Sequence, residues 1–375
     1  MDPRTLETPR LLLDESRMLA NVERMRAHLH GLGVPLRLHV KTAKCIDAAR
    51  PAMARPEGPI AVSTLKEAEY FFDHGVTDIL YAVGITPNKL DHVLDLRRRG
   101  VRLAVVLDSL DAARLVAEKA RAAHDPVDVL VEIDCDGHRS GVKPEAPRLL
   151  DIGRHLHEHG ATLRGVMTHA GASYDCRTTD AIRAMAEQER AAAVRAARRL
   201  RMIGLRCPVV SVGSTPTATF AAELTGVTEV RAGVFVFFDL VMAGLGVCRL
   251  DDIALSVVTS VIGHQPEKGW IIVDAGWMAM SRDRGTAGQA IDQGYGVVCD
   301  IAGRVIDDLT MVAANQEHGI LARRRGSTRP LPDLPLGTLL RILPNHACAT
   351  GAQFDRYHVL RDGKVADVWA RFTGW

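Results

Sequence analysis

A lysine ends an apolar run near the start of the chain, in the segment 36–44 (LRLHVKTAK). Burying an ammonium group is costly unless the group is paired or its pKa falls, and most lysines at such places extend to solvent. A lysine at a strand end can also attack a carbonyl group and form a Schiff base. Lys41 is therefore the first candidate catalytic residue, and His39 lies two residues earlier on the same side of the expected strand.

Two glycine-containing segments could bind phosphate. The first, GSTPT, offers Gly213 for close approach of the backbone and the hydroxyls of Ser214 and Thr215, ahead of a helix whose N-terminus favours anions. Ser and Thr would serve equally well in a turn that caps this helix. The second, RAG, covers residues 231–233. A lysine together with a phosphate site indicates either a sugar-phosphate aldolase or a pyridoxal phosphate enzyme.

The elements that would position these residues follow an alternating pattern. Residues 16–32 have helical spacing, with Met18, Val22, Met25 and Leu29 on one face. Eight mostly apolar, strand-like runs then follow at 36–40, 59–63, 78–82, 102–107, 127–133, 163–168, 208–212 and 227–230. Helix-like runs separate them, for example at 65–74, 109–123, 145–160 and 178–203. This order predicts an α/β fold, a (β/α)8 barrel of the TIM type, whose active site lies at the C-terminal ends of its strands.

That end of the barrel would collect several polar segments. Lys41 follows the first strand, Arg139 lies in DCDGHRSG after the fifth, and His169 and Tyr174 lie in THAGASY after the sixth. GSTPT and RAG follow the seventh and eighth strands, whose loops are the usual phosphate site of this fold. We expect His169, at a strand's C-terminal end, to be the general base.

The alternation of strand-like and helix-like segments ends in the last third of the chain. Strand-like pieces at 253–263, 270–274, 296–300, 309–313, 338–343 and 357–368 are separated by Gly, Pro and Asp turns without clear helices, and 321–335 is a charged, proline-rich loop. This predicts a mostly β C-terminal domain. The expected organisation is an N-terminal strand within 1–15 that packs with the β domain, a barrel over 16–245, and the β domain over 246–375. A sugar-phosphate aldolase needs no such second domain, so its presence favours pyridoxal phosphate.

Two metal-ligand side chains lie close together in the β domain. His346 and Cys348 are two residues apart in an expected extended segment, so both side chains can face one way. An imidazole and a thiolate suit Zn²⁺ or another borderline divalent ion, and two protein ligands leave positions open for water and substrate. By spacing alone the pair is a weak signal, because buried cysteines commonly behave as small apolar residues.

Nine motifs taken together resemble those of the D-threonine aldolases closely and those of the D-serine dehydratases more loosely. In chain order they are HVKTAK, STLKEAE, DGHRSGV, THAGASY, VSVGSTPT, EVRAGVFVFFD, DAGWMAMSRDRGT, NQEHG and LPNHACAT. Both groups are alanine racemase-like, fold-type III pyridoxal phosphate enzymes. The resemblance runs nearly end to end, and the combination of HVKTAK with NHACAT is its specific part.

The resemblance implies roles for individual residues. Lys41 would bind pyridoxal 5'-phosphate covalently, Arg139 would reach the phenolic oxygen of the cofactor, Tyr174 would lie by the pyridine ring, and Arg231 would contact cofactor or substrate. The residues implied at the phosphate are Gly213, Ser214, Thr215, Gly233 and Val234. His346 and Cys348 would bind a divalent metal, with Mn²⁺ as first choice and Zn²⁺ or Mg²⁺ as alternatives. A homodimer is also implied, in which the β domain of one subunit closes the barrel mouth of the other.

The activity that this resemblance implies is a retro-aldol cleavage. D-threonine and related D-β-hydroxy-α-amino acids would give glycine and an aldehyde, reversibly, with Lys41 as cofactor anchor and His169 as base. The alternative is a D-serine dehydratase that forms pyruvate and ammonia, and a non-catalytic pyridoxal phosphate carrier ranks below it. A racemase would leave the metal motif without a role. Gln316, Glu317, His318 and Lys44 receive no role.

Composition agrees with a cytoplasmic enzyme that acts on small amino acids and aldehydes. The 375 residues carry a net charge of +2, so no basic field indicates nucleic acid. No apolar run approaches the ~20 residues of a membrane span, and the N-terminus lacks the apolar core of a signal peptide. The seven cysteines are odd in number and form no CxxC pair, which favours reduced thiols.

Overall fold

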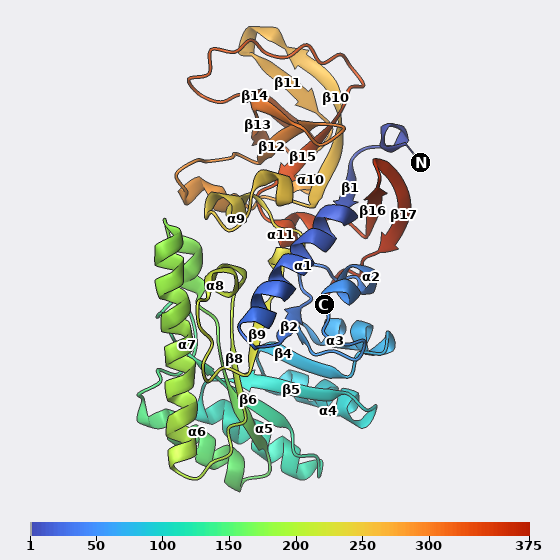
Figure 1. Ribbon diagram of the computed structural model, residues 1–375. Helices are drawn as coiled ribbons and strands as arrows, with labels where there is room; N and C mark the ends of the chain where they lie inside the picture. The colour runs from blue at the N-terminus through green and yellow to red at the C-terminus, as the bar shows by residue number, and fades with distance from the viewer. Residues whose placement is uncertain (1) are drawn as a thin grey trace. The chain divides into compact units, whose positions relative to one another are not determined.

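The structure is a computed structural model that describes residues 2–375 (Figure 1). The chain forms two compact units. The barrel unit comprises Arg24–Gly233 and Gly374–Trp375, and the β unit comprises Met1–Glu23 and Val234–Thr373. Each unit has its own sheet and its own buried core, so each is described by itself.

The barrel unit contains a closed barrel of eight parallel strands, as the sequence predicts. The strands are β2 (Leu36–His39), β3 (Ile60–Val62), β4 (Asp78–Gly84), β5 (Arg102–Leu107), β6 (Asp128–Ile133), β7 (Thr162–Thr168), β8 (Val209–Val212) and β9 (Glu229–Ala232). The main helices are α3 (Leu65–Asp73), α4 (Leu90–Arg98), α5 (Leu110–Ala122), α6 (Pro147–Glu158), α7 (Thr179–Met202) and the short α8 (Thr215–Phe220). One apolar cluster takes a residue from each of five neighbouring strands: Ala61, Leu80, Val106, Leu130 and Met167.

Several of these helices begin at a hydroxyl residue placed just after a strand. The side chains of Thr64, Ser109, Thr178 and Ser214 each accept a hydrogen bond from the backbone N–H three residues later, at 3.0 to 3.2 Å. Such a cap satisfies amides that the first turn of a helix leaves unpaired. The caps therefore fix where α3, α5, α7 and α8 begin.

The β unit is built on a nine-stranded sheet in the order β11-β14-β13-β12-β15-β10-β1-β16-β17, with a further pairing of β11 to β10. Its strands are β1 (Arg10–Asp14), β10 (Leu255–Gln265), β11 (Trp270–Val273), β12 (Gly296–Asp300), β13 (Val305–Ala314), β14 (Gly319–Arg323), β15 (Leu339–Pro344), β16 (Arg356–Arg361) and β17 (Lys364–Ala370). The N-terminal strand β1 pairs antiparallel with β10 and parallel with β16. The first residues of the chain thus share a sheet with the last hundred.

Three local expectations for the β unit were wrong. The segment 357–368 is two antiparallel strands, because Asp362 and Gly363 both take positive φ (48° and 72°) in a tight turn between them. The charged loop expected from 321 begins as strand β14, which pairs with β11 and β13. Short helices, α9 (Leu240–Gly244), α10 (Trp277–Met280) and α11 (Ala347–Gly351), also occur in this unit.

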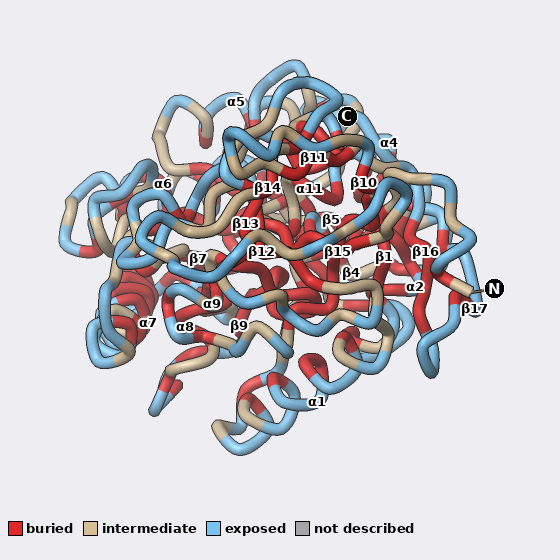
Figure 2. The backbone as a smooth tube through the Cα atoms, turned by 90° about the horizontal axis from the view of Figure 1, so that it is seen from above, coloured by how far each residue is buried: buried red, intermediate tan, exposed pale blue. Residues whose placement is uncertain are grey.

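Burial follows the periodicity of the sequence. Helix α1 (Glu15–Gly31) alternates between buried and exposed turns in Figure 2, and Met18, Val22, Met25 and Leu29 are its buried apolar residues, as predicted. Helix α7 shows the same alternation. Across residues 2–375, no helix has both the length and the apolar character required to cross a membrane.

Candidate active site

Lys41 lies in the turn that follows β2, with its side chain exposed. The backbone N–H of Lys44 donates to the carbonyl of Val40 at 2.8 Å and closes the turn. The ammonium of Lys44 lies 2.9 Å from a carboxylate oxygen of the fully buried Glu67 on α3. Glu67 also accepts the backbone N–H of Ser63. Lys44, which the sequence left without a role, therefore ties the turn that carries Lys41 to the adjacent helix.

Two glycines let the backbone approach closely at the ends of β8 and β9. Gly213 has φ +131°, and a Cβ there would lie 2.3 Å from the carbonyl oxygen of Arg231. A Cβ on Gly233 would lie 2.5 Å from the carbonyl oxygen of His39. Only glycine fits at these two positions. The two glycines therefore let the backbone of β8 and β9 pack closely against neighbouring strand ends, and we call this pair of glycines the glycine cradle.

Ser214 and Thr215 follow directly, and both are buried. The hydroxyl of Ser214 caps α8 by accepting from the N–H of Thr217, and it lies 3.1 Å from the hydroxyl of Ser173. The capping alternative for GSTPT is thus confirmed, and Ser214 is held rigidly beside the glycine cradle. Val234 opens a buried 3-10 turn in the β unit.

The barrel brings Lys41, Arg139, His169 and Arg231 into one electrostatic environment. Burial, together with the positive charges of Arg139, Lys41 and Arg231, lowers the pKa of His169 to about 3, although the hydrogen bond with Gly213 opposes the shift. Burial and the same three cations hold the pKa of His39 well below its usual value. A concentration of positive charge next to a glycine cradle fits a phosphorylated anion such as pyridoxal phosphate.

His169 follows β7 and is held in one orientation. Its Nδ1 lies 3.1 Å from the carbonyl oxygen of Gly213. A carbonyl can only accept, so Nδ1 carries the proton and Nε2 keeps a free lone pair. The ring of Tyr174 lies nearby, with 6.3 Å between the ring centroids. Because the pKa is low, His169 is neutral at pH 7 and can accept a proton at Nε2.

Two buried charged groups fix the backbone on both sides of His169, and the sequence analysis missed one of them, Glu189. Glu189 on α7 accepts the N–H of Ala170 at 2.8 Å. The guanidinium of Arg231 donates to the carbonyl of Thr168 at 2.5 Å. Glu189 was detectable in principle, because it is a carboxylate on the otherwise apolar face of α7.

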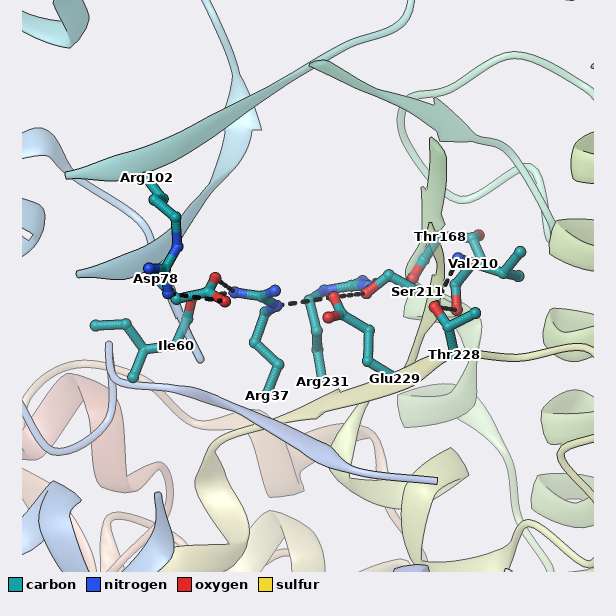
Figure 3. A network of polar contacts seen from close by, with 10 residues as sticks. All are labelled: Arg37, Ile60, Asp78, Arg102, Thr168, Val210, Ser211, Thr228, Glu229 and Arg231. Atoms are coloured by element: carbon teal, nitrogen blue, oxygen red, sulfur yellow. Dashed lines mark hydrogen bonds and ion pairs between the residues drawn. The ribbon is translucent and has the colours of Figure 1, made fainter. Parts of the chain in front are cut away.

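Arg231 belongs to a polar network that crosses the barrel interior (Figure 3). It donates to the hydroxyl of Ser211 at 2.7 Å, and Ser211 donates to Glu229 at 2.6 Å. Glu229 also accepts from Arg37 at 2.8 Å, and Arg37 bonds Asp78 at 2.8 Å. The chain of contacts runs from the start of β4 to the end of β7. Ser211 and Thr168 therefore hold the Arg231 guanidinium in one orientation, as is typical of a residue that holds a bound group in place.

A cavity of about 210 Å³ lies at the opposite, N-terminal end of the barrel strands. Charged residues of both signs line it: Arg37, Asp78, Arg102, Asp128, Arg164 and Glu229. These side chains pair with one another or with Arg97 at distances between 2.8 and 4.0 Å. This end of a TIM barrel serves stability, and the catalytic candidates lie at the other end.

In the β unit, His346 and Cys348 do come together, although their segment is not extended. His346 is the extended residue just before α11, and Cys348 is in the first turn of that helix. Burial by itself would lower the pKa of His346, but hydrogen bonds with Asp283 and Cys348 raise it to about 11. The Asp283 carboxylate lies 2.6 Å from Nδ1 of His346.

A divalent metal fits this pair by the chemistry of its donors. Imidazole nitrogen and thiolate sulfur suit Zn²⁺ better than Mn²⁺ or Mg²⁺, which prefer oxygen. Among residues 2–375, no group of three or more His, Cys, Asp and Glu is arranged to hold a metal. The segment 316–318, which received no role, is an exposed turn between β13 and β14.

Comparison with known proteins identifies the family of the chain. The alanine racemase N-terminal domain family matches residues 13–241, and a putative serine dehydratase domain matches residues 254–360. D-threo-3-hydroxyaspartate dehydratase of Delftia sp. is 56% identical over 99% of this chain and 98% of its own. Its solved structure has a TM-score of 0.96 with full coverage of both chains, and a variant with one cysteine changed to alanine is described as metal-free.

More distant relatives widen the range of reactions. D-threonine aldolase of Arthrobacter sp. is 28% identical over 97% of this chain and 92% of its own. The structure of D-threonine aldolase from Filomicrobium marinum has a TM-score of 0.82 at 27% identity, covering 99% of this chain and 96% of that one. The chain therefore belongs to the alanine racemase-like, fold-type III family of pyridoxal phosphate enzymes, within the group of D-amino acid lyases and dehydratases.

Proposed function

We propose that the chain is a dehydratase that converts D-threo-3-hydroxyaspartate to oxaloacetate and ammonia. The observation that carries this proposal is the 56% identity, over nearly the whole chain, with an enzyme of that name. Each unit separately supports the reaction class: the barrel unit has an exposed lysine at a strand end, and the β unit has a His–Cys pair suited to a metal. Atoms balance, since the water lost at the β-carbon is regained when the product imine hydrolyses.

In this proposal, residues of the two units hold the cofactor and the metal. Lys41 supplies the amine that binds the cofactor, Gly213 and Gly233 form the phosphate cradle, and His346 with Cys348 binds the metal. When bound, pyridoxal phosphate would accept the electron pair released at the substrate α-carbon, and a divalent ion would act as a Lewis acid toward the β-hydroxyl group.

Two residues of the barrel unit act on the substrate in this proposal. His169 Nε2, which carries no proton, accepts a hydrogen bond from the substrate amino group and orients it. Lys41 Nζ then takes the proton from the α-carbon, after which the β-hydroxyl leaves. Arg231, fixed by Ser211 and Thr168, keeps positive charge at the site throughout.

Retro-aldol cleavage, the activity expected from the sequence, is the second candidate. It is favoured by the neutral His169, whose Nε2 could take the β-hydroxyl proton, and by the D-threonine aldolase relative. The substrate bond that breaks would then be Cα–Cβ. D-Threonine would give glycine and acetaldehyde, and 3-hydroxyaspartate would give glycine and glyoxylate.

A product assay separates these candidates. Holoenzyme is incubated with D-threo-3-hydroxyaspartate, D-serine and D-threonine, with and without a chelator. We expect oxaloacetate from the first substrate and little product from D-threonine. Glycine as the main product would instead establish an aldolase, and pyruvate formed fastest from D-serine would establish a D-serine dehydratase. If none of the three substrates reacts, the enzyme class itself is wrong.

The same assay tests the anchor and the metal. Lys41→Ala should lower turnover by roughly 10³-fold or more, because no other residue can replace the covalent link. Zn²⁺ should restore chelated enzyme better than Mn²⁺ if the donor atoms decide the choice. The homodimer remains a prediction, which sedimentation of the holoenzyme would test.

A further inference from the structure

The turn that carries His346 and Cys348 is held at several points by side chains of its own unit. The Asn345 side chain accepts the N–H of Thr286 at 2.8 Å and donates to the carbonyl of Gly294 at 2.6 Å. The buried Asp239 accepts the N–H of Ala347 at 2.9 Å. With the backbone fixed on both sides of His346, the remaining freedom is rotation of its imidazole ring.

Asp283 removes that freedom. One oxygen of its carboxylate lies 2.6 Å from Nδ1 of His346, and the other accepts the N–H of Gly285 at 3.0 Å. The carboxylate is therefore anchored in its own turn before it contacts the histidine. That turn begins at Ser281, a non-glycine residue with φ +69°, a conformation that the surrounding structure must maintain.

The arginines on either side of Asp283 do not neutralise it. Arg282 lies over the ring of Trp277, 5.3 Å from its centroid. Arg284 pairs with Asp292 at 2.6 Å. The Asp283 carboxylate is thus left to act on the imidazole. An acceptor at Nδ1 leaves Nε2 as the nitrogen that can bind a metal, beside the thiol of Cys348.

We propose that Asp283 is the positioning residue of the metal pair: it orients His346 so that Nε2 and the sulfur of Cys348 bind one divalent ion. This rests on the proposed function only for the presence of a metal. The carboxylate also strengthens the imidazole as a ligand, because a partly negative ring donates more electron density. No local sequence pattern indicates this role, since Asp283 lies 63 residues before His346.

The test measures metal affinity rather than turnover. Zn²⁺ dissociation constants are determined by competition with a chromophoric chelator for the parent, Asp283→Ala, Asp283→Asn and the control Asp307→Asn, an exposed residue that pairs with Arg329. Loss of this kind of partner typically weakens metal binding by about 10–100-fold. We expect that loss for Asp283→Ala, a smaller loss for Asp283→Asn, which retains an acceptor oxygen, and affinity within about twofold for Asp307→Asn.

Cobalt(II) supplies a spectroscopic readout that general destabilisation would not imitate. Parent protein loaded with Co²⁺ should show thiolate-to-metal charge transfer and visible ligand-field bands. Asp283→Ala, at metal concentrations that saturate it, should shift the ligand-field bands because the imidazole is no longer fixed. If Asp283→Ala does not fold, the Co²⁺ bands of Asp283→Asn are compared with those of the parent instead.

Unchanged Zn²⁺ affinity and unchanged Co²⁺ bands in the Asp283 variants would overturn the proposal, as would a parent that binds neither metal. Failure of the proposed dehydratase activity would leave these binding measurements unaffected. The two proposals can therefore fail separately.

Discussion

His169 in the barrel unit and His346 in the β unit are both partly exposed, yet the pKa of the first falls to about 3 and that of the second rises to about 11. Burial is the largest influence on both rings, and it disfavours the imidazolium in both. The difference comes from the neighbours: three cations surround His169, whereas His346 contacts Asp283 and Cys348.

This difference assigns each histidine a kind of chemistry. A neutral imidazole whose Nδ1 is bonded to a carbonyl can accept a proton at Nε2. An imidazole bonded to a carboxylate is instead oriented for metal coordination. The same side chain is thus neutral in one unit and favours the protonated form in the other, because the sign of the surrounding charge differs.

The largest effect that tests this comparison should come from His169→Asn. If the neutral ring is a proton acceptor, turnover should fall by about 10²–10⁴-fold. The dissociation constant of pyridoxal phosphate should change little, because the Gly213 cradle and the cations remain. Steady-state assays and cofactor titration measure the two quantities, with exposed His30→Asn as the control. Equal losses of turnover and of cofactor binding would mean that His169 has only a structural role.

Arg231→Met removes one of the cations that depress the pKa of His169. Because Arg231 is buried and bonded to Ser211 and Thr168, its loss leaves Glu229 poorly compensated. Breaking such a buried pair costs about 3–5 kcal/mol of unfolding free energy.

The matched control for this variant is Arg164→Met, at the other end of the barrel. The half-exposed Arg164 lies 4.0 Å from Asp128, so its loss should cost about 1 kcal/mol or less. Urea unfolding of the cofactor-free proteins measures the loss of unfolding free energy in Arg231→Met and in Arg164→Met. If both variants lose a similar amount of unfolding free energy, the polar network does not stabilise Arg231 in the way described.

The smallest effect concerns pH. A histidine with a folded pKa near 3 and an unfolded pKa near 6.5 binds more protons when unfolded throughout the range between them. Stability of the cofactor-free protein should therefore fall as pH decreases below about 6.5, by up to about 1.4 kcal/mol per pH unit for His169. His39 should add a decrease of the same sign.

Urea unfolding at pH 7, 6 and 5 measures this dependence for the parent and His169→Asn. On acidification the free energy of unfolding should decrease less in the variant than in the parent. The decrease that remains in the variant should be the contribution of His39. Identical pH dependence would show that His169 is not held neutral in the folded protein.

The part of the site that could be predicted depended on how many residues of the chain separate the interacting side chains. Lys41, His169 and Gly213 were identified because each follows a barrel strand, and the topology of a closed parallel barrel brings those strand ends together. Arg231 was expected after the last strand, but it lies within β9. The spacing of His346 and Cys348 indicated a pair, although a helix rather than an extended segment brings the two side chains together.

The partners of these residues could not be predicted. Glu67 is 23 residues from Lys44, Glu189 is 19 residues from Ala170, and Asp283 is 63 residues from His346. Nothing in a local pattern distinguishes such carboxylates from those that face solvent. Their burial and their contacts arise only when the helices and turns pack.

By itself, the sequence determined the closed barrel, the mostly β unit and the places where lysine, glycine and histidine meet at strand ends. Those features follow from periodicity and strand order, which are local properties repeated along the chain. Only the tertiary structure decided the charge state of each histidine. A pKa depends on burial and on every charge within a few ångströms, and residues far apart in the chain supply both.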